Sequence, residues 1–266
     1  MIDSLCFTGH YPFRKLSIVN LTELTNLMLR EGFQSILVLH FSSLFYRNPW
    51  VANEELLSES GKIVDEIKDR IRVYLLAGIN PEYAVSREKL AGYKGAFRGV
   101  VVAPLYHGFK LSSKNTRNLL KIVSDLDLTL GVLGYLEDPR EAHRAYAFRY
   151  KLTLNDARSF IREVKEWGYS RVVLYSFPSE LLFQLSSDIS NASILVDVSS
   201  NDVYGPIYDY VKTLVESVGE DLVVFSSKAP LTYVKSALFK VLYSEISSKA
   251  KEKILRDNPR RLFNIC

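Results

Sequence analysis

The chain has 266 residues, of which 47% are hydrophobic and 24% are charged, so it is long enough to bury a large core. Its net charge of +4 is spread over 34 basic and 30 acidic residues, which argues against a nucleic-acid-binding protein with a clustered basic face. The two cysteines, Cys6 and Cys266, exclude a disulfide framework and favour a cytoplasmic protein, and no stretch approaches the ~20 apolar residues of a membrane helix.

Short β-branched runs alternate with segments of helical spacing along the whole chain. In chain order we expect a strand at 2–8, a helix at 21–30, a strand at 35–41, a helix at 54–69, strands at 71–77 and 99–105, a helix at 114–124, a strand at 128–134, a helix at 153–167, strands at 171–176 and 193–198, a helix at 206–217, a strand at 221–226, and helices at 230–243 and 247–256. Several of the strands are apolar throughout, which is typical of parallel strands covered on both faces.

Two helices carry clear end signals. Thr153 and Asp156 have the spacing of a capping box at the start of the helix at 153–167, and Gly168 follows that helix as a stop. The last helix is expected to end before Asn258-Pro259, because proline disfavours helical backbone at the residue that precedes it.

Eight strands alternating with helices predict an α/β fold of the (β/α)8 TIM-barrel type. The competing fold is an open doubly wound sheet, which usually has fewer strands and an early glycine-rich phosphate loop. The chain contains no GxGxxG or GxxxxGK[ST] motif. No low-complexity linker divides it, so residues 1–266 are expected to form a single TIM-barrel domain.

Five stretches match motifs of one known family in the correct order. Residues 225–230 (FSSKAP) are similar to F-G-S-D-x-P, residues 2–9 (IDSLCFTG) to I-D-x-H-x-H-x-G, and residues 97–104 (FRGVVVAP) to F-x-G-[IV]-K-L-x-P. Residues 77–81 (AGINP) resemble a third strand that ends in Asn-Pro, and residues 253–263 resemble I-L-x-x-N-A-x-R-L-F. The chain thus resembles the amidohydrolase 2 family, the metal-dependent hydrolases and decarboxylases built on a TIM barrel.

The resemblance implies a metal held by two histidines of the first strand, histidines of the fifth and sixth strands and the aspartate of the eighth. At these positions the chain has Leu5, Phe7, Leu133, Ser176 and Lys228. Leucine and phenylalanine have no donor atoms, and a lysine ammonium repels a cation. We therefore expect that no metal is bound at the family site and that the protein has no cofactor.

Lys228 has three candidate roles. It could fill the space of the metal and pair with Asp197 or Glu137, it could bind an anionic ligand, or it could act as a Schiff-base nucleophile. Asp197 lies near the end of the seventh strand, where it is either a general base, or a partner for a nearby cation or a cap for the following helix. The catalytic candidates are Lys228, Asp197 and His40.

Three of the four histidines lie near strand ends, namely His10, His40 and His107. They could form a rebuilt metal site, although satisfied loop histidines are the more common case. Side-chain alternation directs Cys6 away from the side of its neighbours Leu5 and Phe7, so Cys6 is expected to be a small buried hydrophobic residue.

Two functional hypotheses follow. In the first, the chain is an amidohydrolase-like pseudoenzyme that binds a small anionic molecule or a partner through Lys228, His10, His40, His107, Ser176 and Asp197. In the second, it is an active hydrolase or decarboxylase that uses a rebuilt metal site or metal-free acid–base chemistry. Neither nucleic acid nor a membrane is expected as a partner. The basic and aromatic segment at 139–151 is expected to be a lid over the barrel or a solvated helix.

Overall fold

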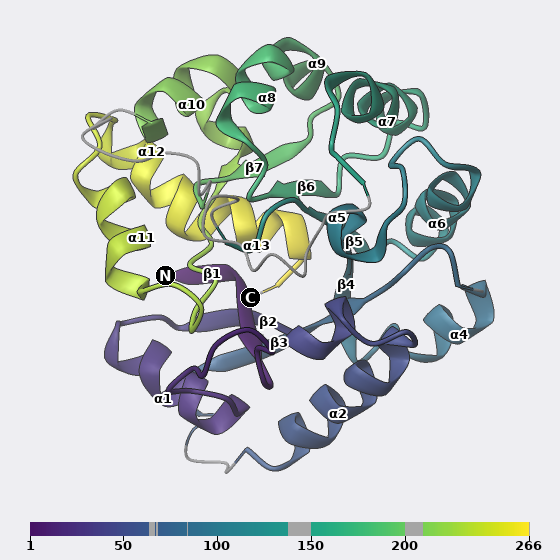
Figure 1. Cartoon of the computed structure of the whole chain (residues 1–266). Helices are drawn as coiled ribbons and strands as arrows, with labels where there is room; N and C mark the ends of the chain where they lie inside the picture. Colours follow the sequence, from purple (N-terminus) through teal and green to yellow (C-terminus); the bar gives the residue numbers. More distant parts are fainter. Residues whose placement is uncertain (64–66, 68, 84, 138–149, 200–209, 266) are drawn as a thin grey trace.

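Eight parallel strands form one sheet in chain order in the computed structural model, which describes residues 1–63, 67, 69–83, 85–137, 150–199 and 210–265. Figure 1 views the barrel along its axis, with the strands in the centre and helices around them. The strands are β1 (Ile2–Thr8), β2 (Ser35–His40), β3 (Arg72–Gly78), β4 (Phe97–Val102), β5 (Thr129–Leu133), β6 (Val172–Tyr175), β7 (Leu195–Asp197) and β8 (Val223–Val224).

Backbone hydrogen bonds join the end of the sheet to its beginning. The Ser4 N–H donates to the Phe225 carbonyl at 3.0 Å, and the Lys228 N–H donates to the Leu5 carbonyl at 3.0 Å. Because β1 to β8 also pair in parallel with their neighbours, the eight strands make a barrel. The predicted (β/α)8 architecture is confirmed, and the open doubly wound sheet is excluded.

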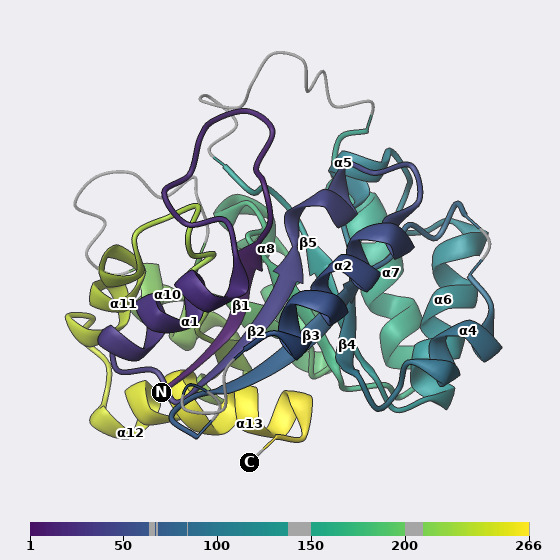
Figure 2. The same ribbon diagram turned by 90° about the horizontal axis from the view of Figure 1, so that it is seen from below.

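Helices follow most of the strands and cover the outside of the barrel (Figure 1). They are α1 (Leu21–Arg30), α2 (Pro49–Gly61), α4 (Arg87–Gly92), α5 (Pro104–His107), α6 (Lys114–Asp125), α7 (Leu154–Glu166), α8 (Ser179–Gln184), α9 (Ser186–Asn191), α10 (Tyr210–Val218), α11 (Val234–Leu242), α12 (Ser248–Glu252) and α13 (Asn258–Phe263). Short 3-10 turns form at η1 (Phe41–Leu44) and η2 (Glu220–Leu222), and a π-helical turn forms at η3 (Lys253–Asp257). Figure 2 shows α12 and α13 beneath the barrel, beside the first residues of β1.

Several predicted boundaries are wrong for local reasons. The second helix begins at Pro49 rather than residue 54, because the Asn48 side chain caps it and proline suits its first turn. The fourth strand ends at Val102, since Pro104 begins α5. The last helix does not end before Asn258-Pro259: it continues through η3 into α13, where the missing N–H of Pro259 lies in the first turn.

Other predictions are confirmed or fall outside the described residues. The helices at 21–30 and 114–124 match α1 and α6 closely, and both start at polar caps, Asn20 and Ser113. Residues 206–209 of the helix expected at 206–217, and residues 139–149 of the segment at 139–151, lie outside the described residues. Within the described ranges, no helix has both the length and the apolar character to cross a membrane.

The buried apolar residues form two clusters, one on each face of the barrel wall. Leu5 and Phe7 belong to the cluster inside the barrel, whereas Cys6 belongs to the cluster between the strands and the helices. Burial, and then the charge of Asp3, raise the pKa of the Cys6 thiol, so it is a buried hydrophobic residue and not a reactive thiolate. The alternation predicted from the sequence is therefore confirmed.

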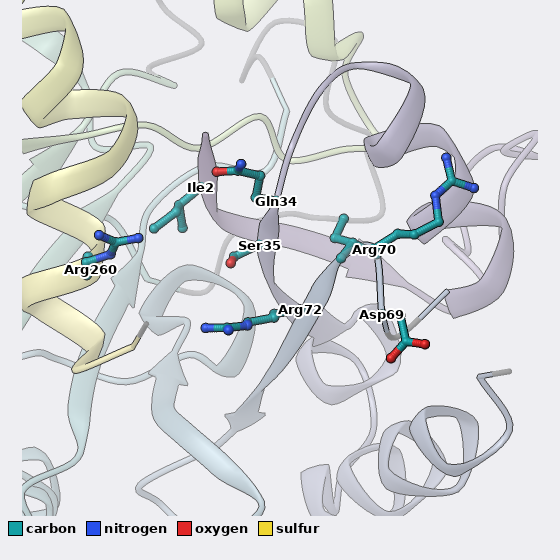
Figure 3. Close-up of a pocket in the computed structure, with 8 residues that line it drawn as sticks. Ile2, Gln34, Ser35, Asp69, Arg70, Arg72 and Arg260 are labelled. Carbon is teal, nitrogen blue, oxygen red and sulfur yellow. The ribbon is translucent and has the colours of Figure 1, made fainter. Parts of the chain in front are cut away.

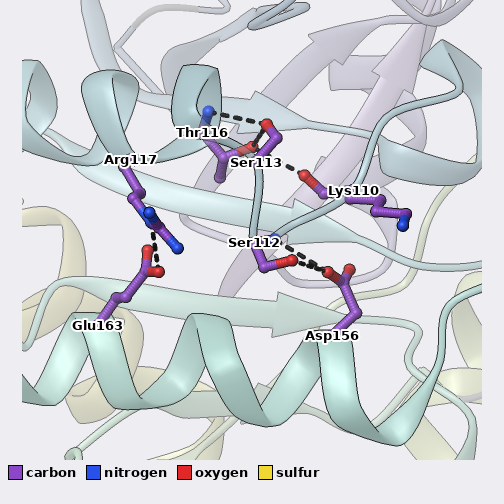
Figure 4. Close-up of polar contacts among 7 residues, drawn as sticks. All are labelled: Lys110, Ser112, Ser113, Thr116, Arg117, Asp156 and Glu163. Carbon is purple, nitrogen blue, oxygen red and sulfur yellow. Dashed lines mark hydrogen bonds and ion pairs between the residues drawn. The ribbon is translucent and has the colours of Figure 1, made fainter.

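Asp156 anchors the start of α7 to the loop that precedes α6 (Figure 4). Its carboxylate accepts hydrogen bonds from the Leu111 N–H at 2.8 Å and the Ser112 N–H at 3.0 Å, and it also binds the hydroxyls of Ser112 and Tyr150. The Asp156 N–H in turn donates to the Thr153 hydroxyl, which caps the helix as predicted. The carboxylate thus serves a tertiary contact rather than the local capping box.

Replacing Asp156 by alanine is expected to lower the free energy of unfolding by about 2–3 kcal/mol, because it leaves the buried Leu111 N–H without an acceptor. The matched control is Asp188→Ala, which removes a half-exposed ion pair with Arg158 and should cost less than about 1 kcal/mol. Urea unfolding followed by circular dichroism measures both. Equal losses in the two variants would contradict the anchoring role of Asp156.

Candidate functional site

Apolar side chains occupy three of the positions that the resemblance to the amidohydrolase 2 family assigns to metal ligands. Leu5, Phe7 and Leu133 are fully buried in the interior cluster. The Phe7 ring stacks on Phe41 at the end of β2, with ring centroids 4.5 Å apart and planes inclined by 6°. No lone pair is available from these side chains, so they do not fit a metal ion.

An aromatic cap, made of Tyr11, Phe13, Phe41, Phe45 and Tyr106, covers this interior at the C-terminal ends of the strands. Its rings are linked by centroid distances between 5.3 and 6.1 Å, for example 5.3 Å from Tyr11 to Phe41 and 6.0 Å from Phe45 to Tyr106. The residues come from the loops after β1 and β2 and from α5. The cap therefore continues the apolar packing of the interior up to the mouth of the barrel.

Glu137 ties the cap to the loop after β5. Its carboxylate accepts a hydrogen bond from the Tyr11 hydroxyl at 2.6 Å and lies 3.6 Å from the Arg14 guanidinium. The amide N–H of Leu136 donates to the Tyr106 hydroxyl at 2.8 Å. Burial and the neighbouring Glu137 raise the pKa of Tyr11, so its hydroxyl stays protonated and acts as the donor.

Lys228 lies just past β8 in the wall of the barrel, and its side chain is buried. Its backbone has a φ of 56°, in the left-handed region, and its N–H is fixed by the bond to Leu5. The ammonium donates to the Leu136 carbonyl at 3.3 Å. Burial raises the pKa of Asp197, and the charge of Lys228 opposes that rise. Lys228 thus carries a positive charge into a protein interior that otherwise consists mostly of hydrocarbon.

Asp197 ends β7 and is fully buried among donors. One oxygen accepts from the Ser176 N–H at 2.7 Å, and the other accepts from the hydroxyls of Ser199 and Ser226. Burial raises the pKa of Asp197, while these hydrogen bonds and the charge of Lys228 oppose that rise. Of the two partners that the sequence suggested for Lys228, Asp197 interacts with it electrostatically.

Ser176 follows β6 and connects the last strands. Its hydroxyl lies 2.8 Å from that of Ser199 and 3.2 Å from the Ser199 carbonyl. Like Lys228, it has a left-handed backbone, with φ of 49°. We define the buried polar network as Asp197, Ser176, Ser199 and Ser226, and the charge of Lys228 acts on the carboxylate of this network. One of these residues, Ser226, was not singled out from the sequence as a site residue, although it lies next to a strand end.

A second buried carboxylate, Asp3, was also missed by the sequence analysis. It accepts from the Leu5 N–H at 3.1 Å and from the Ser227 N–H at 3.1 and 3.2 Å. Burial raises the pKa of Asp3 to about 6, against the effect of its hydrogen bonds to Ser227. A charged residue within a predicted strand was the signal that could have identified it.

His40 is buried at the end of β2, whereas His10 is exposed. The Ser42 N–H donates to Nδ1 of His40 at 3.3 Å, and Nε2 lies 3.7 Å from the Glu55 carboxylate. Burial and then the neighbouring His10 lower the pKa of His40 to about 4. At neutral pH the His40 ring is therefore neutral, with its proton on Nε2.

His107 closes α5 and contacts the same turn as His40. Its Nε2 lies 3.0 Å from the Ser43 carbonyl, which makes Nε2 the protonated nitrogen, and its buried Nδ1 has no hydrogen-bond partner among the described residues. Burial lowers the pKa of His107 to about 4. The Ser43 hydroxyl also donates to the His40 carbonyl, so both histidines contact this turn. The described residues contain no group of three His, Cys, Asp or Glu side chains that could hold a metal ion.

The comparisons place the fold among known structures. No protein-family model matches the chain, and no curated protein matches it at a significant level. Among solved structures, amidohydrolase 2 from Bifidobacterium longum subsp. infantis is 15% identical with a TM-score of 0.65, covering 100% of this chain and 98% of its own. The 5-carboxyvanillate decarboxylase of Sphingomonas paucimobilis is 10% identical with a TM-score of 0.69, covering 100% and 99%.

A third structure of the same fold is the dihydroxybenzoic acid decarboxylase of Polaromonas sp. JS666, with bound manganese and the inhibitor 2-nitroresorcinol. It is 13% identical with a TM-score of 0.67, covering 99% of this chain and 96% of its own. The resemblance that the sequence motifs indicate is thus confirmed in the fold, over nearly the whole chain. At this identity, similarity of fold does not assign an activity.

Proposed function

We propose that the chain is a single-domain, divergent relative of the amidohydrolase 2 family that binds a small anionic molecule near Lys228 and does not hydrolyse it through a metal. The observation that carries the proposal is the replacement of every family ligand position by Leu5, Phe7, Leu133, Ser176 and Lys228. The first three pack in hydrocarbon, and the last carries a positive charge into the same interior.

The electrostatic argument follows from the sign of that charge. A metal site concentrates positive charge, to which an anionic substrate binds. Lys228 supplies positive charge from the protein itself, so an anion can be attracted to the barrel mouth without a metal. The buried carboxylate of Asp197 offsets part of this charge, while the Leu136 carbonyl accepts a hydrogen bond from the ammonium.

A second candidate is an active hydrolase or decarboxylase that works without the family metal. It is favoured by the solved structures of the same fold, two of which are decarboxylases by name. In this case Asp197 would act as general base and Lys228 as general acid or Schiff-base nucleophile. A Schiff base would be trapped by borohydride reduction as a covalent adduct on Lys228, which separates the two candidates.

We expect the purified, tag-free protein to retain less than about a tenth of an equivalent of any metal after exposure to zinc, manganese and iron and then desalting. The measurement is elemental mass spectrometry. Nearly one equivalent of metal that is lost in a His40→Gln or His107→Gln variant would contradict the proposal and restore a rebuilt metal site.

Anion binding is tested by thermal shifts with small carboxylates such as citrate and benzoate. A stabilising ligand should raise the melting temperature of the wild type, because it binds only the folded state. Lys228→Met should abolish that shift, while Arg87→Gln, which removes an exposed positive charge on α4, should leave it unchanged. Turnover of esters, lactones or aromatic acids by the wild type, lost in Lys228→Met, would favour the second candidate instead.

A further inference from the structure

A cavity of about 320 Å³ opens at the N-terminal end of the barrel, at the opposite end of the strands from Lys228. Its lining residues are Ile2, Gln34, Ser35, Asp69, Arg70, Ile71, Arg72 and Arg260. Figure 3 shows that they come from the starts of the first three strands and from α13, which lies beneath the barrel. The cavity is large enough for a small ligand.

Strand pairing sets the position of the polar groups. Ile2 pairs with Ser35 across β1 and β2, and Ser35 pairs with Arg72 across β2 and β3. The Arg72 N–H also donates to the Gln34 carbonyl at 2.9 Å. One row of the sheet therefore presents an apolar side chain, a hydroxyl and a guanidinium along the rim of the barrel, and α13 places Arg260 beside that row.

Two of the arginines point toward each other across this row (Figure 3). Arg72 extends from the start of β3 and Arg260 from α13, with Ile2 and Ser35 between them, whereas Arg70 and Asp69 extend away. Within the described residues, neither Arg72 nor Arg260 forms an ion pair. In contrast, the adjacent Arg256 is paired with Glu252 at 2.6 Å and with Asp257 at 2.8 Å.

Convergent like charges repel each other, and an anion bound between them removes that repulsion. The planar guanidinium offers paired N–H groups that match the oxygens of a phosphate or a carboxylate. Two such groups facing each other favour a dianion over a monoanion. A phosphate ester meets this requirement, and its organic part would rest on the apolar side chains of Ile2 and Ile71.

We propose that this cavity binds a phosphate ester, with the phosphoryl group held between Arg72 and Arg260 and within reach of Gln34 and Ser35. The binding is electrostatic and hydrogen-bonded, with no covalent step. The site is independent of the anion binding proposed at Lys228, because it lies at the other end of the barrel.

The test is isothermal titration calorimetry with inorganic phosphate and with phenyl phosphate, at constant ionic strength and with acetate as the monoanion control. Both phosphates should bind, phenyl phosphate the more tightly, and acetate should bind at least about tenfold more weakly. The double variant Arg72→Gln/Arg260→Gln should weaken phosphate binding by at least about tenfold. Arg72→Lys/Arg260→Lys keeps the charge and should lie between that variant and the wild type.

The matched control is Arg87→Gln, which removes the same charge from an exposed side chain of α4 that does not line the cavity, and it should change the dissociation constant by less than about threefold. No binding to the wild type at millimolar phosphate would overturn the proposal, as would equal affinity in the double variant. Loss of binding in Lys228→Met would also overturn it and would place the phosphate at the C-terminal end of the barrel.

Discussion

Replacing Asp197 by alanine is expected to lower the free energy of unfolding by about 3–5 kcal/mol. The change removes the acceptor of the Ser176 N–H and of the hydroxyls of Ser199 and Ser226. It also removes a buried carboxylate whose charge interacts with that of Lys228. Urea unfolding followed by circular dichroism and tryptophan fluorescence measures the loss.

A double-mutant cycle isolates the interaction between the two charges. Asp197→Asn removes the charge and keeps one oxygen acceptor for the Ser176 N–H, while an NH2 group replaces the oxygen that accepts from the hydroxyls of Ser199 and Ser226. Lys228→Met removes the ammonium at similar volume. The double variant should be more stable than the sum of the two single losses predicts, by about 1–3 kcal/mol. Additive losses would mean that Asp197 and Lys228 do not stabilise each other.

The second large effect concerns pH. Between pH 3 and pH 8 the wild type is expected to lose about 3 kcal/mol of stability relative to Asp3→Asn. Burial raises the folded-state pKa of Asp3 from 3.8 to about 6, so the folded protein holds this proton more tightly than the unfolded chain does. The resulting stabilisation is fully present below the unfolded pKa and is lost as the pH rises through about 6. A rise of about 2 pKa units corresponds to about 3 kcal/mol.

The readout is the difference in unfolding free energy between the wild type and the variant, measured at several pH values in urea. The asparagine side chain of the Asp3→Asn variant keeps an oxygen for the Leu5 and Ser227 N–H groups, so the two proteins differ mainly in one titrating proton. Ser58→Ala, a change without a titrating group, is the control and should show a constant difference. A constant difference for Asp3→Asn as well would show that Asp3 titrates normally.

Of the two residues behind these effects, one was a predicted site residue and the other was not. Asp197 was a candidate because it lies near the end of a predicted strand. In the structure it belongs to the buried polar network, and the charge of Lys228 acts on it. Asp3 was not a candidate, since its partner Ser227 lies 224 positions away along the chain. No local pattern contains that information, because the contact forms only when β1 closes the barrel against the end of β8.

For the histidines too, the sequence indicated their positions but not their contacts. Their positions near strand ends were evident, so a metal site assembled from His10, His40 and His107 was a reasonable hypothesis. The structure instead gives His40 and His107 separate hydrogen bonds to one turn, η1, and exposes His10. The tautomers of the two buried rings depend on backbone groups of η1, and their lowered pKa values result mainly from burial. The positions of the histidines in the sequence reveal neither.

The sequence by itself determined the barrel, the helices α1, α6 and α7 with their polar caps, and the inward direction of Leu5 and Phe7. These features depend on local periodicity and on side chains within a few residues of one another. The tertiary structure alone decided the aromatic cap, the two buried carboxylates, the continuation of the last helix into α13, and the facing of Arg72 and Arg260. Each of these depends on groups distant in the chain, or on the packing of a segment against the barrel, and closing the barrel is what brings them together.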